Sequence, residues 1–490
     1  MNLPSDFTEY TRQLMGDDMY GRLAEALDSP DVPASMRINP FKACGHDVDE
    51  RLLCQAVPWC PSTGRYLGAR PNFTFDPLFH AGAYYVQEAS SMFVDYVVRQ
   101  LVGRPVTMLD LCAAPGGKST ALRAALSEGS LLFSNEPMRQ RAQVLAENMQ
   151  KFGHEDVVVT NNYPRDYRKS RLMFDAILAD VPCSGEGMFR KDDGARAEWS
   201  LQNVDNCWHL QREIVEDVWQ CLRPGGLLIY STCTFNAHED EENVMWIASE
   251  LGADIVELPV DTEWGIVPSL VGGIPAYRFL PGFTRGEGLF LAVLRKHGGD
   301  DNDASGVEIV EQANAVATQS KKVKKDRRRV QTAQKEGKAK MQPAVTIPLR
   351  GASNYVLRKV ADTLTAVPER WSKVFDTAAS SLRIIHAGVG LGVEKGRDVI
   401  PAQSLALSRQ LADDAYPRVE VGYADAVSYL RKEAVALPGD TPRGFVLLTY
   451  HGLPLGFEKN IGNRANNLYP QEWRIKSSHV PDEACRIMNM

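Results

Sequence analysis

The strongest constraint on the fold is an alternation of apolar strands and amphipathic helices between residues 105 and 297. Short apolar segments predict strands, and the longer segments between them have helical spacing. The predicted strands are Val106–Leu111, Ser130–Asn135, Val157–Thr160, Phe174–Asp180, Leu227–Ser231 and Gly288–Leu294. This alternation is typical of an α/β fold with a doubly wound, mostly parallel sheet. Ligands of such sheets bind at the carboxyl ends of the strands.

The length of 490 residues predicts more than one domain. Residues 83–102 have the spacing of an amphipathic helix, and Arg383–Ala387 has the composition of a strand. Composition predicts four segments: an N-terminal α/β extension at 1–104, a catalytic domain at 105–297, a flexible basic linker at 298–342 and a small β-rich domain at 343–490.

The uneven distribution of charge bears on the binding partner. The chain carries a net charge of −7, but the segment Lys321–Lys340 has ten basic and two acidic residues. This segment therefore carries +8, and the remainder carries −15. A concentrated basic segment can bind a phosphate backbone even in an acidic protein. We interpret the segment as an electrostatic RNA tether; a merely soluble tether is the alternative.

Several classes of protein are disfavoured by composition and pattern. No apolar run approaches the roughly 18 residues of a transmembrane helix, and the polar N-terminus lacks the pattern of a signal peptide. We therefore expect a cytoplasmic protein without a membrane partner. The nine cysteines include no C-x-x-C pair, which argues against a disulfide framework or a cysteine-based zinc site. No metal is expected, and a monomer is the default.

A glycine-containing turn joins the first predicted strand to its helix. Small residues there let a ligand approach the backbone, and the free amides at the start of a helix favour an anionic group. A phosphate-binding loop needs a glycine five positions before Gly117, where the chain has Cys112, and the dinucleotide pattern G-x-G-x-x-G is absent. An S-adenosylmethionine loop remains. Glu136 ends the second strand, where an acid suits ribose hydroxyls; a charge at the start of a helix is the alternative.

The segment LCAAPGGKST, residues 111–120, resembles the cofactor loop of the Sun/Nol-type RNA cytosine-5 methyltransferases. The resemblance implies that S-adenosylmethionine is the cofactor and that Glu136 binds its ribose hydroxyls. Arg141 matches a position that is frequently basic in this family. Seven loop residues are implied to line the methionine and ribose: Cys112, Ala113, Ala114, Pro115, Gly116, Gly117 and Lys118.

The same resemblance makes a prediction about the adenine. Many family members carry an acid near the end of the third strand that holds this ring. This chain has Asn161, Asn162 and Tyr163 there, so an asparagine amide could replace the contact.

Two further cysteines follow two predicted strands. Cys183 comes three residues after Asp180, and Cys233 comes two residues after Ser231. Both turns should open at the edge of the sheet that carries the glycine loop, so two thiols would face one cleft; two unrelated buried cysteines are the alternative. Carbon 5 of cytosine becomes nucleophilic when a thiolate adds to carbon 6, and a thiol is also a good leaving group. Asp180 is placed to stabilise this adduct near ring nitrogen 3, and we expect it to contact the cofactor as well.

The family resemblance assigns the roles of the two cysteines. In the RNA enzymes the cysteine of the Thr-Cys motif attacks, which gives Cys233 as the nucleophile. The cysteine of the Pro-Cys motif assists release, which gives Cys183 as the helper. Arg190 and Lys191 match basic family positions that contact the phosphate or base, and a solvated surface pair is their alternative. Other segments that resemble the family in cleft-shaping or architectural roles are RIN (37–39), QEASS (87–91) and GEG (286–288).

The end of the chain resembles bacterial small-subunit rRNA methyltransferases of the RsmF (YebU) type, in which a PUA-like RNA-binding domain follows the catalytic core. The matching segments are Gly456–Lys459, NNLYP (466–470) and WRI (473–475). The resemblance implies methylation of carbon 5 of a cytidine in 16S rRNA, with the small ribosomal subunit as a partner. Because a paired base must leave its helix before a thiol reaches it, we expect an unpaired or flippable cytosine. The alternatives are the same chemistry on tRNA and a non-catalytic RNA-binding assembly factor.

Overall fold

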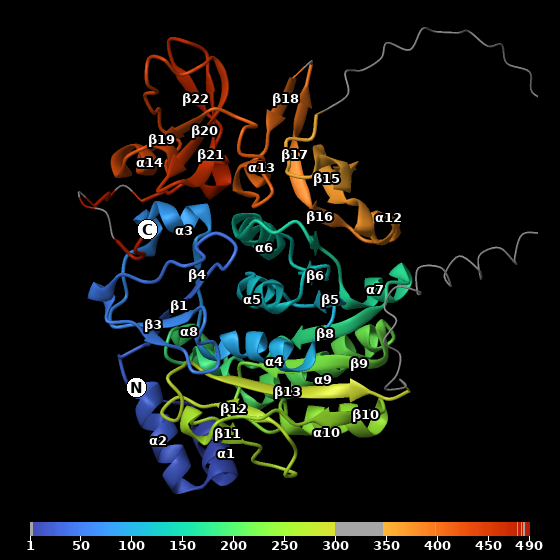
Figure 1. The fold of residues 1–490 in the computed structure, drawn as a ribbon. Coiled ribbons are helices and arrows are strands. Elements are labelled where there is room, and N and C mark those ends of the chain that lie inside the picture. The colour runs from blue at the N-terminus through green and yellow to red at the C-terminus, as the bar shows by residue number, and fades with distance from the viewer. Residues whose placement is uncertain (1–2, 299–345, 397, 478, 482, 484–485) are drawn as a thin grey trace, which may run out of the picture.

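The computed structural model describes residues 3–298 and 346–490, except residues 397, 478, 482 and 484–485. Its main element is a ten-stranded sheet in the order β11-β12-β13-β9-β8-β5-β6-β7-β16, with β10 paired to β13 (Figure 1). Five central strands run parallel: β7 (Val157–Thr160), β6 (Leu131–Asn135), β5 (Thr107–Asp110), β8 (Phe174–Asp180) and β9 (Leu222–Thr232). The predicted parallel core is confirmed.

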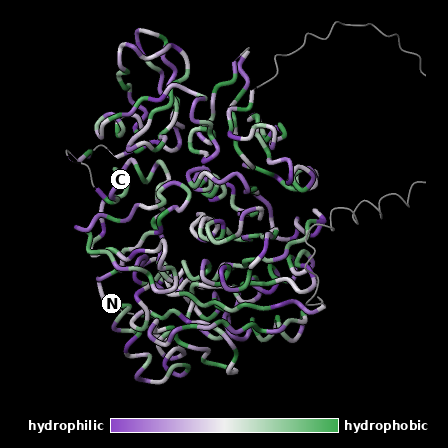
Figure 2. Tube along the Cα trace, viewed as in Figure 1, coloured by the Kyte–Doolittle hydropathy of each residue, from purple (hydrophilic) through white to green (hydrophobic). Residues whose placement is uncertain are grey.

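Helices cover both faces of this sheet. One face packs against α4 (Phe93–Leu101), α5 (Gly117–Ala125) and α6 (Arg139–Phe152). The opposite face packs against α7 (Pro164–Ser170), α9 (Leu201–Trp219) and α10 (Glu241–Glu250). The predicted double winding is therefore confirmed. Strand β13 (Leu289–Lys296), which is buried along most of its length, is mainly hydrophobic in Figure 2, as expected of a strand covered on both faces.

Antiparallel strands extend the sheet at both edges. On one side β13 pairs with β9, and it is followed by β12 (Tyr277–Phe279) and β11 (Val267–Pro268); β10 (Ala253–Val256) also pairs with β13. On the other side β7 pairs with β16 (Ile384–Ala387). The strand expected at Arg383–Ala387 thus exists, and it lies in the sheet of the catalytic core. The predicted domain boundaries stay predictions, but this sheet crosses them.

The N-terminal region begins with α1 (Ser5–Met15) and α2 (Asp17–Asp28) and then forms a sheet of its own, in the order β2-β3-β1-β4. The helix predicted over 83–102 is wrong in its first half. Residues Tyr84–Val86 form strand β4, which pairs with β1 (Ala34–Ile38), and helix α4 begins only at Phe93. The β-forming side chains of Tyr84, Tyr85 and Val86 and the available edge of β1 override the helical spacing. The remaining elements are β2 (Gln55–Ala56), β3 (Gly64–Leu67) and α3 (Pro77–Ala81).

The C-terminal region contains two further four-stranded sheets. The first consists of β14 (Tyr355–Val360), β15 (Thr363–Pro368), β17 (Val389–Lys395) and β18 (Asp398–Pro401). The second consists of β19 (Arg418–Glu420), β20 (Gly444–Tyr450), β21 (Leu453–Asn460) and β22 (Ala465–Asn467). Three helices accompany them: α12 (Ser372–Ala379), α13 (Gln403–Leu407) and α14 (Tyr423–Leu430). The predicted basic segment 321–340 lies outside the described residues.

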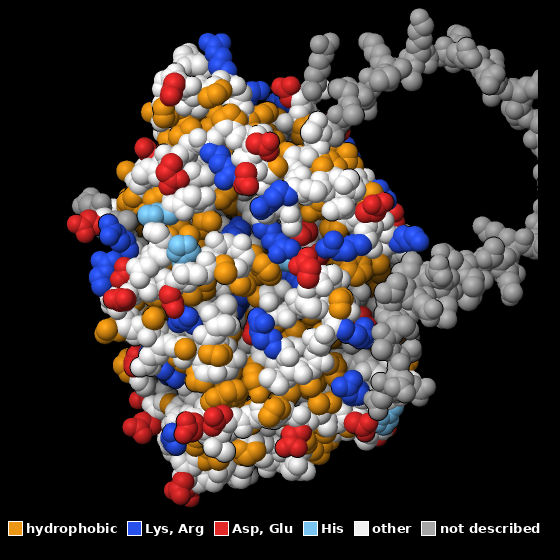
Figure 3. Space-filling model, viewed as in Figure 1, with side chains coloured by type: hydrophobic (Ala, Val, Ile, Leu, Met, Phe, Trp, Pro, Cys, Tyr) orange, Lys and Arg blue, Asp and Glu red, His pale blue; other side chains and the backbone are white. Residues whose placement is uncertain are grey.

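Ion pairs join the C-terminal region to the loop between α6 and β7. Arg370 pairs with Asp156, whose side chain is fully buried, at 2.5 Å, and Arg409 pairs with Glu155 at 2.9 Å. His154, Glu155 and Asp156 are close enough to hold a metal ion, but both carboxylates already have arginine partners. Lys and Arg side chains gather across the middle of one face, over this junction (Figure 3). In the described part of the chain, no helix is both long and apolar enough to cross a bilayer.

A buried arginine provides a test of the packing around the sheet. Arg278 on β12 is fully buried and pairs with Asp240, at 3.1 Å, and with Glu241. Removing one partner of a buried ion pair leaves uncompensated charge, which costs about 3–5 kcal/mol. We expect Arg278→Met to lower the free energy of unfolding in urea by that amount. Arg358→Ala, which breaks an exposed pair with Asp376, should cost less than about 1 kcal/mol; equal effects would contradict this account.

Candidate active site

Two thiols meet beyond the ends of neighbouring strands. Strands β8 and β9 are parallel, with Asp180 opposite Ser231, so the turns that follow them leave the sheet together. The Sγ atoms of Cys183 and Cys233 are 3.0 Å apart, within hydrogen-bonding distance. The backbone N–H of Cys233 also donates to Cys183 Sγ at 3.3 Å. The two thiols therefore lie together, because the turns leave the sheet from the same edge. That they face one cleft stays a prediction.

Two buried carboxylates hold the cysteine turns against each other. Glu186, from the Cys183 turn, accepts the backbone N–H of Phe235 at 2.6 Å. Glu239, from beyond Cys233, accepts the backbone N–H of Ser184 at 3.0 Å. The Asn236 amide donates to both acids, at 3.0 and 2.8 Å. Both carboxylates are fully buried, and burial together with the charge of Glu186 raises the pKa of Glu239. Each turn thus supplies the acid that binds the backbone of the other.

Sequence reasoning missed these three side chains. Glu186 lies three residues after Cys183, and Asn236 and Glu239 lie three and six residues after Cys233. The spacing was visible, but acids in loops are usually solvated, and nothing local distinguishes a buried one.

A glycine is required where the turns touch. A Cβ at position 187 would lie 2.9 Å from the carbonyl oxygen of Cys233. The Gly187 N–H donates to that same oxygen at 2.8 Å. The close approach fixes the backbone of the Cys233 turn, and any side chain at position 187 would displace it.

The glycine loop lies beside the cysteines and is connected to them through Asp180. Lys118 donates to Asp180 Oδ2 at 2.9 Å, and Ser231 donates to Oδ1 at 2.7 Å. Burial lowers the pKa of Lys118, but the ion pair with Asp180 outweighs it, so the net pKa is raised and the ammonium is retained. Gly116 has a φ of +114°, a conformation that favours glycine. A cation is therefore held at the edge where both thiols lie.

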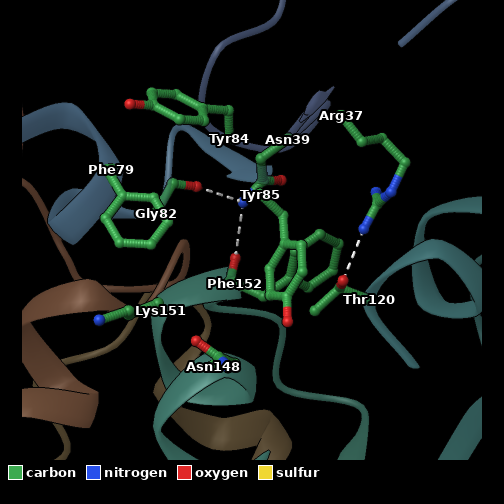
Figure 4. A pocket seen from close by; sticks show the side chains of 10 residues that line it. All are labelled: Arg37, Asn39, Phe79, Gly82, Tyr84, Tyr85, Thr120, Asn148, Lys151 and Phe152. Carbon is green, nitrogen blue, oxygen red and sulfur yellow. Dashed lines mark hydrogen bonds between the residues drawn. The ribbon is translucent and has the colours of Figure 1, made fainter. Parts of the chain in front are cut away.

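The N-terminal sheet is hydrogen-bonded to helix α5, which follows the glycine loop. Arg37 on β1 donates to Gln87 at 2.9 Å and to Thr120 of α5 at 2.5 Å. Asn39 donates to the carbonyls of Gly82 and Phe152 at 2.8 and 3.0 Å. Figure 4 shows these bonds to Thr120, Gly82 and Phe152 around a small cavity of about 20 Å³. The predicted architectural role of the RIN and QEASS segments agrees with these contacts.

A larger cavity opens at the ends of β6, β7 and β8. Its volume is about 280 Å³. Of the predicted cofactor residues, Cys112 and Glu136 line it; residues 113–118 form the adjoining loop and do not line it. Glu136 is 2% exposed, and its carboxylate accepts the Met138 N–H at 2.8 Å. Residues that sequence reasoning did not place here are Pro137, Met138, Pro164, Arg165, Pro182, Leu210, Glu213, Ile214 and Asp217.

Cys112 and Arg141 have distinct environments in this cavity. Burial and the nearby charge of Asp180 raise the pKa of Cys112, so its thiol stays protonated. Arg141 is exposed, donates to the carbonyl of Ala114 at 3.1 Å and lies 3.6 Å from Glu136.

The structure gives the Asn161 and Asn162 amides partners within the protein, so their contact with adenine stays an untested prediction. The Asn161 amide nitrogen donates to the carbonyls of Glu136 and Pro137 at 2.8 and 2.9 Å. The Asn162 side chain bonds to the backbone of Arg383. Neither side chain lines the cavity, whereas Tyr163, which is 54% exposed, does. Both amides are occupied by backbone groups whose positions the sequence does not reveal.

The structure also gives Arg190 partners within the protein, so its contact with the phosphate or base stays an untested prediction. Its side chain is 6% exposed and pairs with Glu287 at 3.0 Å. It also donates to the carbonyl of Gly286 at 2.7 Å. Arg190 therefore joins two segments of the protein, and Glu287 of the GEG segment has the predicted architectural role. Lys191 lies 4.0 Å from Glu287 with its side chain 37% exposed.

Comparisons with known proteins agree with this arrangement. Three family models match the chain in order. They are the N-terminal domain of 16S rRNA methyltransferase RsmF over residues 3–89, 16S rRNA methyltransferase RsmB/F over 104–295, and the methyltransferase RsmF PUA domain over 416–475. The PUA match includes α14 and strands β19–β22, whereas β14–β18 lie outside it.

Relatives called ribosomal RNA small subunit methyltransferase F are similar over most of the chain. The protein of Aeromonas hydrophila is 29% identical over 85% of this chain and 84% of its own length. That of Erwinia tasmaniensis is 26% identical over 96% of both chains.

Solved structures share the fold. A methyltransferase homolog from Pyrococcus horikoshii has a TM-score of 0.51 and 24% identity, covering 60% of this chain and 95% of its own. NSun6 from the same organism, crystallised with SFG, has a TM-score of 0.51 and 20% identity, covering 60% of this chain and 99% of its own. The three matched domains, in their order and together spanning well over half of the sequence, show that the chain belongs to the RsmF family of 16S rRNA methyltransferases.

Proposed function

We propose that this protein transfers a methyl group from S-adenosylmethionine to carbon 5 of a cytidine in small-subunit ribosomal RNA. The observation that carries the proposal is the pair of thiols, 3.0 Å apart, beside the glycine loop. One thiol adds to the pyrimidine. The second thiol, within reach of the first, assists release of the methylated base from the first thiol.

The cavity at Glu136 has the properties that S-adenosylmethionine requires. Its walls combine a buried carboxylate, suited to two ribose hydroxyls, with the apolar side chains of Met138, Tyr163 and Ile214, suited to the adenine ring. Cys112 lines this cavity, and the adjoining loop, residues 113–118, is joined to the strand that precedes Cys183 by the bond between Lys118 and Asp180. When bound, the cofactor supplies an electrophilic methyl group on a sulfonium.

Cys233 acts as the nucleophile in this proposal. Its thiolate adds to carbon 6 of cytosine, and the electrons of the carbon 5–carbon 6 double bond become available at carbon 5. The ammonium of Lys118 is retained beside Asp180, at the edge of the sheet where Cys233 lies. The family resemblance assigns this role to Cys233, the cysteine of the Thr-Cys motif.

Cys183 stays protonated and assists release. The hydrogen bond with Cys233, burial and the negative charge of Glu239 all raise the pKa of Cys183. Its S–H can therefore donate to the sulfur of Cys233 and stabilise that thiolate. After methylation, a solvent water accepts the proton of carbon 5, and the electrons of that C–H bond re-form the carbon 5–carbon 6 double bond. The carbon 6–sulfur bond breaks at the same time, returning Cys233 as a thiolate beside Cys183.

Asp180 is proposed to orient the base and the cofactor loop together. It holds Lys118 and Ser231 through its two oxygens, and it lies at the end of β8, three residues before Cys183. From there it can meet ring nitrogen 3 of the adduct.

The proposed substrate follows from the family and from the geometry of the turns. The relatives are called small-subunit methyltransferases, and a PUA domain follows the core. The reacting sulfurs lie in partly buried turns, so the cytosine must be unpaired or extruded to reach them.

Methyl transfer provides the direct test. Incubation with methyl-labelled S-adenosylmethionine and unmethylated small subunits should place label in 5-methylcytidine of 16S rRNA, identified by nucleoside mass spectrometry. Naked 16S rRNA and tRNA form separate arms of the same experiment. Label found only in tRNA would contradict rRNA as the substrate and favour tRNA. If the folded protein labels no RNA, the methyltransferase proposal is wrong and a non-catalytic RNA-binding factor is favoured.

The roles of the cysteines can be separated by trapping. Cys183→Ala should accumulate a covalent RNA adduct because release is impaired, and Cys233→Ala should form none because no bond to carbon 6 can form. The adduct is measured as a protein band retarded by labelled RNA on a denaturing gel. The opposite pattern would reverse the two assignments.

The buried acid that spans the turns should act on the rate more than on binding. Glu239→Ala removes the acceptor of the Ser184 N–H and of the Asn236 amide, so the two sulfurs lose their fixed separation. A displacement of about 1 Å can cost about 10²-fold in rate, and we expect kcat to fall by this order with the KM for RNA nearly unchanged. Glu242→Ala, an exposed neighbour bonded to His238, is the control. Equal kcat in the two variants would exclude the positioning role.

A further inference from the structure

Asn161 joins the cofactor cavity to the C-terminal region. Its amide nitrogen donates to the carbonyls of Glu136 and Pro137, two residues that line the cavity. Its backbone N–H donates to the carbonyl of Arg383 at 2.9 Å, and its amide oxygen accepts from the Arg383 guanidinium at 3.3 Å. One side chain therefore contacts both the cavity wall and a residue more than two hundred positions later.

Asn162 fixes Arg383 from the other side. Its amide oxygen accepts the Arg383 N–H at 3.0 Å, and its amide nitrogen donates to the Arg383 carbonyl at 3.3 Å. The backbone of Asn162 is held by Asn135, the last residue of β6. Both polar groups of the Arg383 backbone are thus bound by the two asparagines that follow β7.

Strand β7 is paired with the C-terminal region along its whole length. Strand β16 pairs with β7 from Thr160 back to Val158, and Arg370 pairs with Asp156 just before β7. Strand β7 would otherwise be an exposed edge with unpaired backbone groups. Its carboxyl end, where Asn161 begins, therefore takes its position from residues 370–387.

The position of the Glu136 carboxylate depends on this arrangement. The Glu136 N–H donates to the carbonyl of Thr160 at 3.2 Å, and the Glu136 carbonyl accepts from Asn161. Without these bonds the Glu136–Pro137 backbone would be free to turn, and an acid aimed at two hydroxyls needs a fixed direction.

We propose that the C-terminal region, through Arg383, is a structural part of the cofactor site. Asn161 and Asn162 are positioning residues that transmit the location of Arg383 to Glu136. This inference rests on the proposed function, because it takes the cavity at Glu136 to be the S-adenosylmethionine site.

The test measures binding of S-adenosyl-L-homocysteine to the full-length protein by titration calorimetry. Asn162→Ala is decisive, because it removes the side-chain bonds to Arg383 and leaves every residue lining the cavity intact. We expect its Kd to rise about fivefold, and that of Asn161→Ala about tenfold or more, in proportion to the hydrogen bonds lost. The KM for cofactor should rise equally, while the KM for RNA and kcat at saturating cofactor stay near wild type.

Two controls separate the possible failures. Asn354→Ala, an exposed asparagine of the same region, should leave the Kd unchanged, and Glu136→Ala should raise it strongly. An unchanged Kd in Glu136→Ala would overturn the proposed cofactor site itself. A raised Kd in Glu136→Ala with an unchanged Kd in Asn162→Ala would overturn only the role of the C-terminal region. If Asn162→Ala does not fold, Arg383→Ala replaces it, with an expected two- to threefold rise in Kd for one long hydrogen bond and no rise as the contradicting result.

Discussion

The parallel pairing of β8 with β9 is the constraint on which the active site depends. Its register places Asp180 opposite Ser231, so the next few residues of both strands leave the sheet at one level. Two thiols separated by fifty positions then lie 3.0 Å apart. A shift of register would separate the sulfurs and move Asp180 away from Ser231. The chemistry therefore follows from backbone hydrogen bonds between apolar strands.

The buried carboxylates Glu186 and Glu239 are unfavourable by themselves, but they fix the two cysteine turns. Taking carboxylates out of water is unfavourable unless they are paired or hydrogen-bonded. Glu186 and Glu239 meet this requirement by binding backbone N–H groups of the opposite turn and a shared amide from Asn236. The result is a rigid link between the turns. The pKa of Cys183 is raised mainly by its hydrogen bond with Cys233 and by burial, and to a smaller extent by the charge of Glu239.

The far edge of the sheet shows how a C-terminal region becomes part of a catalytic core. Strand β7 would be an exposed edge, and β16 covers it. The asparagines that follow β7 hold Arg383 on one side and the Glu136–Pro137 backbone on the other. Residues 346–411 are thus joined to the methyltransferase sheet by hydrogen bonds and ion pairs, whereas the matched PUA domain begins only at residue 416.

The sequence by itself determined the parallel core, the glycine loop, the acid Glu136 and the two strand-end cysteines, because periodicity and turn chemistry are local properties. It misassigned residues 83–92, since the helical spacing there gave no sign that the edge of β1 would be available to Tyr84–Val86. It did not reveal that Arg190 pairs with Glu287 or that the Asn161 amide bonds to the carbonyls of Glu136 and Pro137. Only the tertiary structure decided that Glu186 and Glu239 are buried and that β16 completes the sheet. The physical reason is distance along the chain: Asn162 and Arg383 are 221 residues apart, and no local pattern encodes which buried polar groups will satisfy each other.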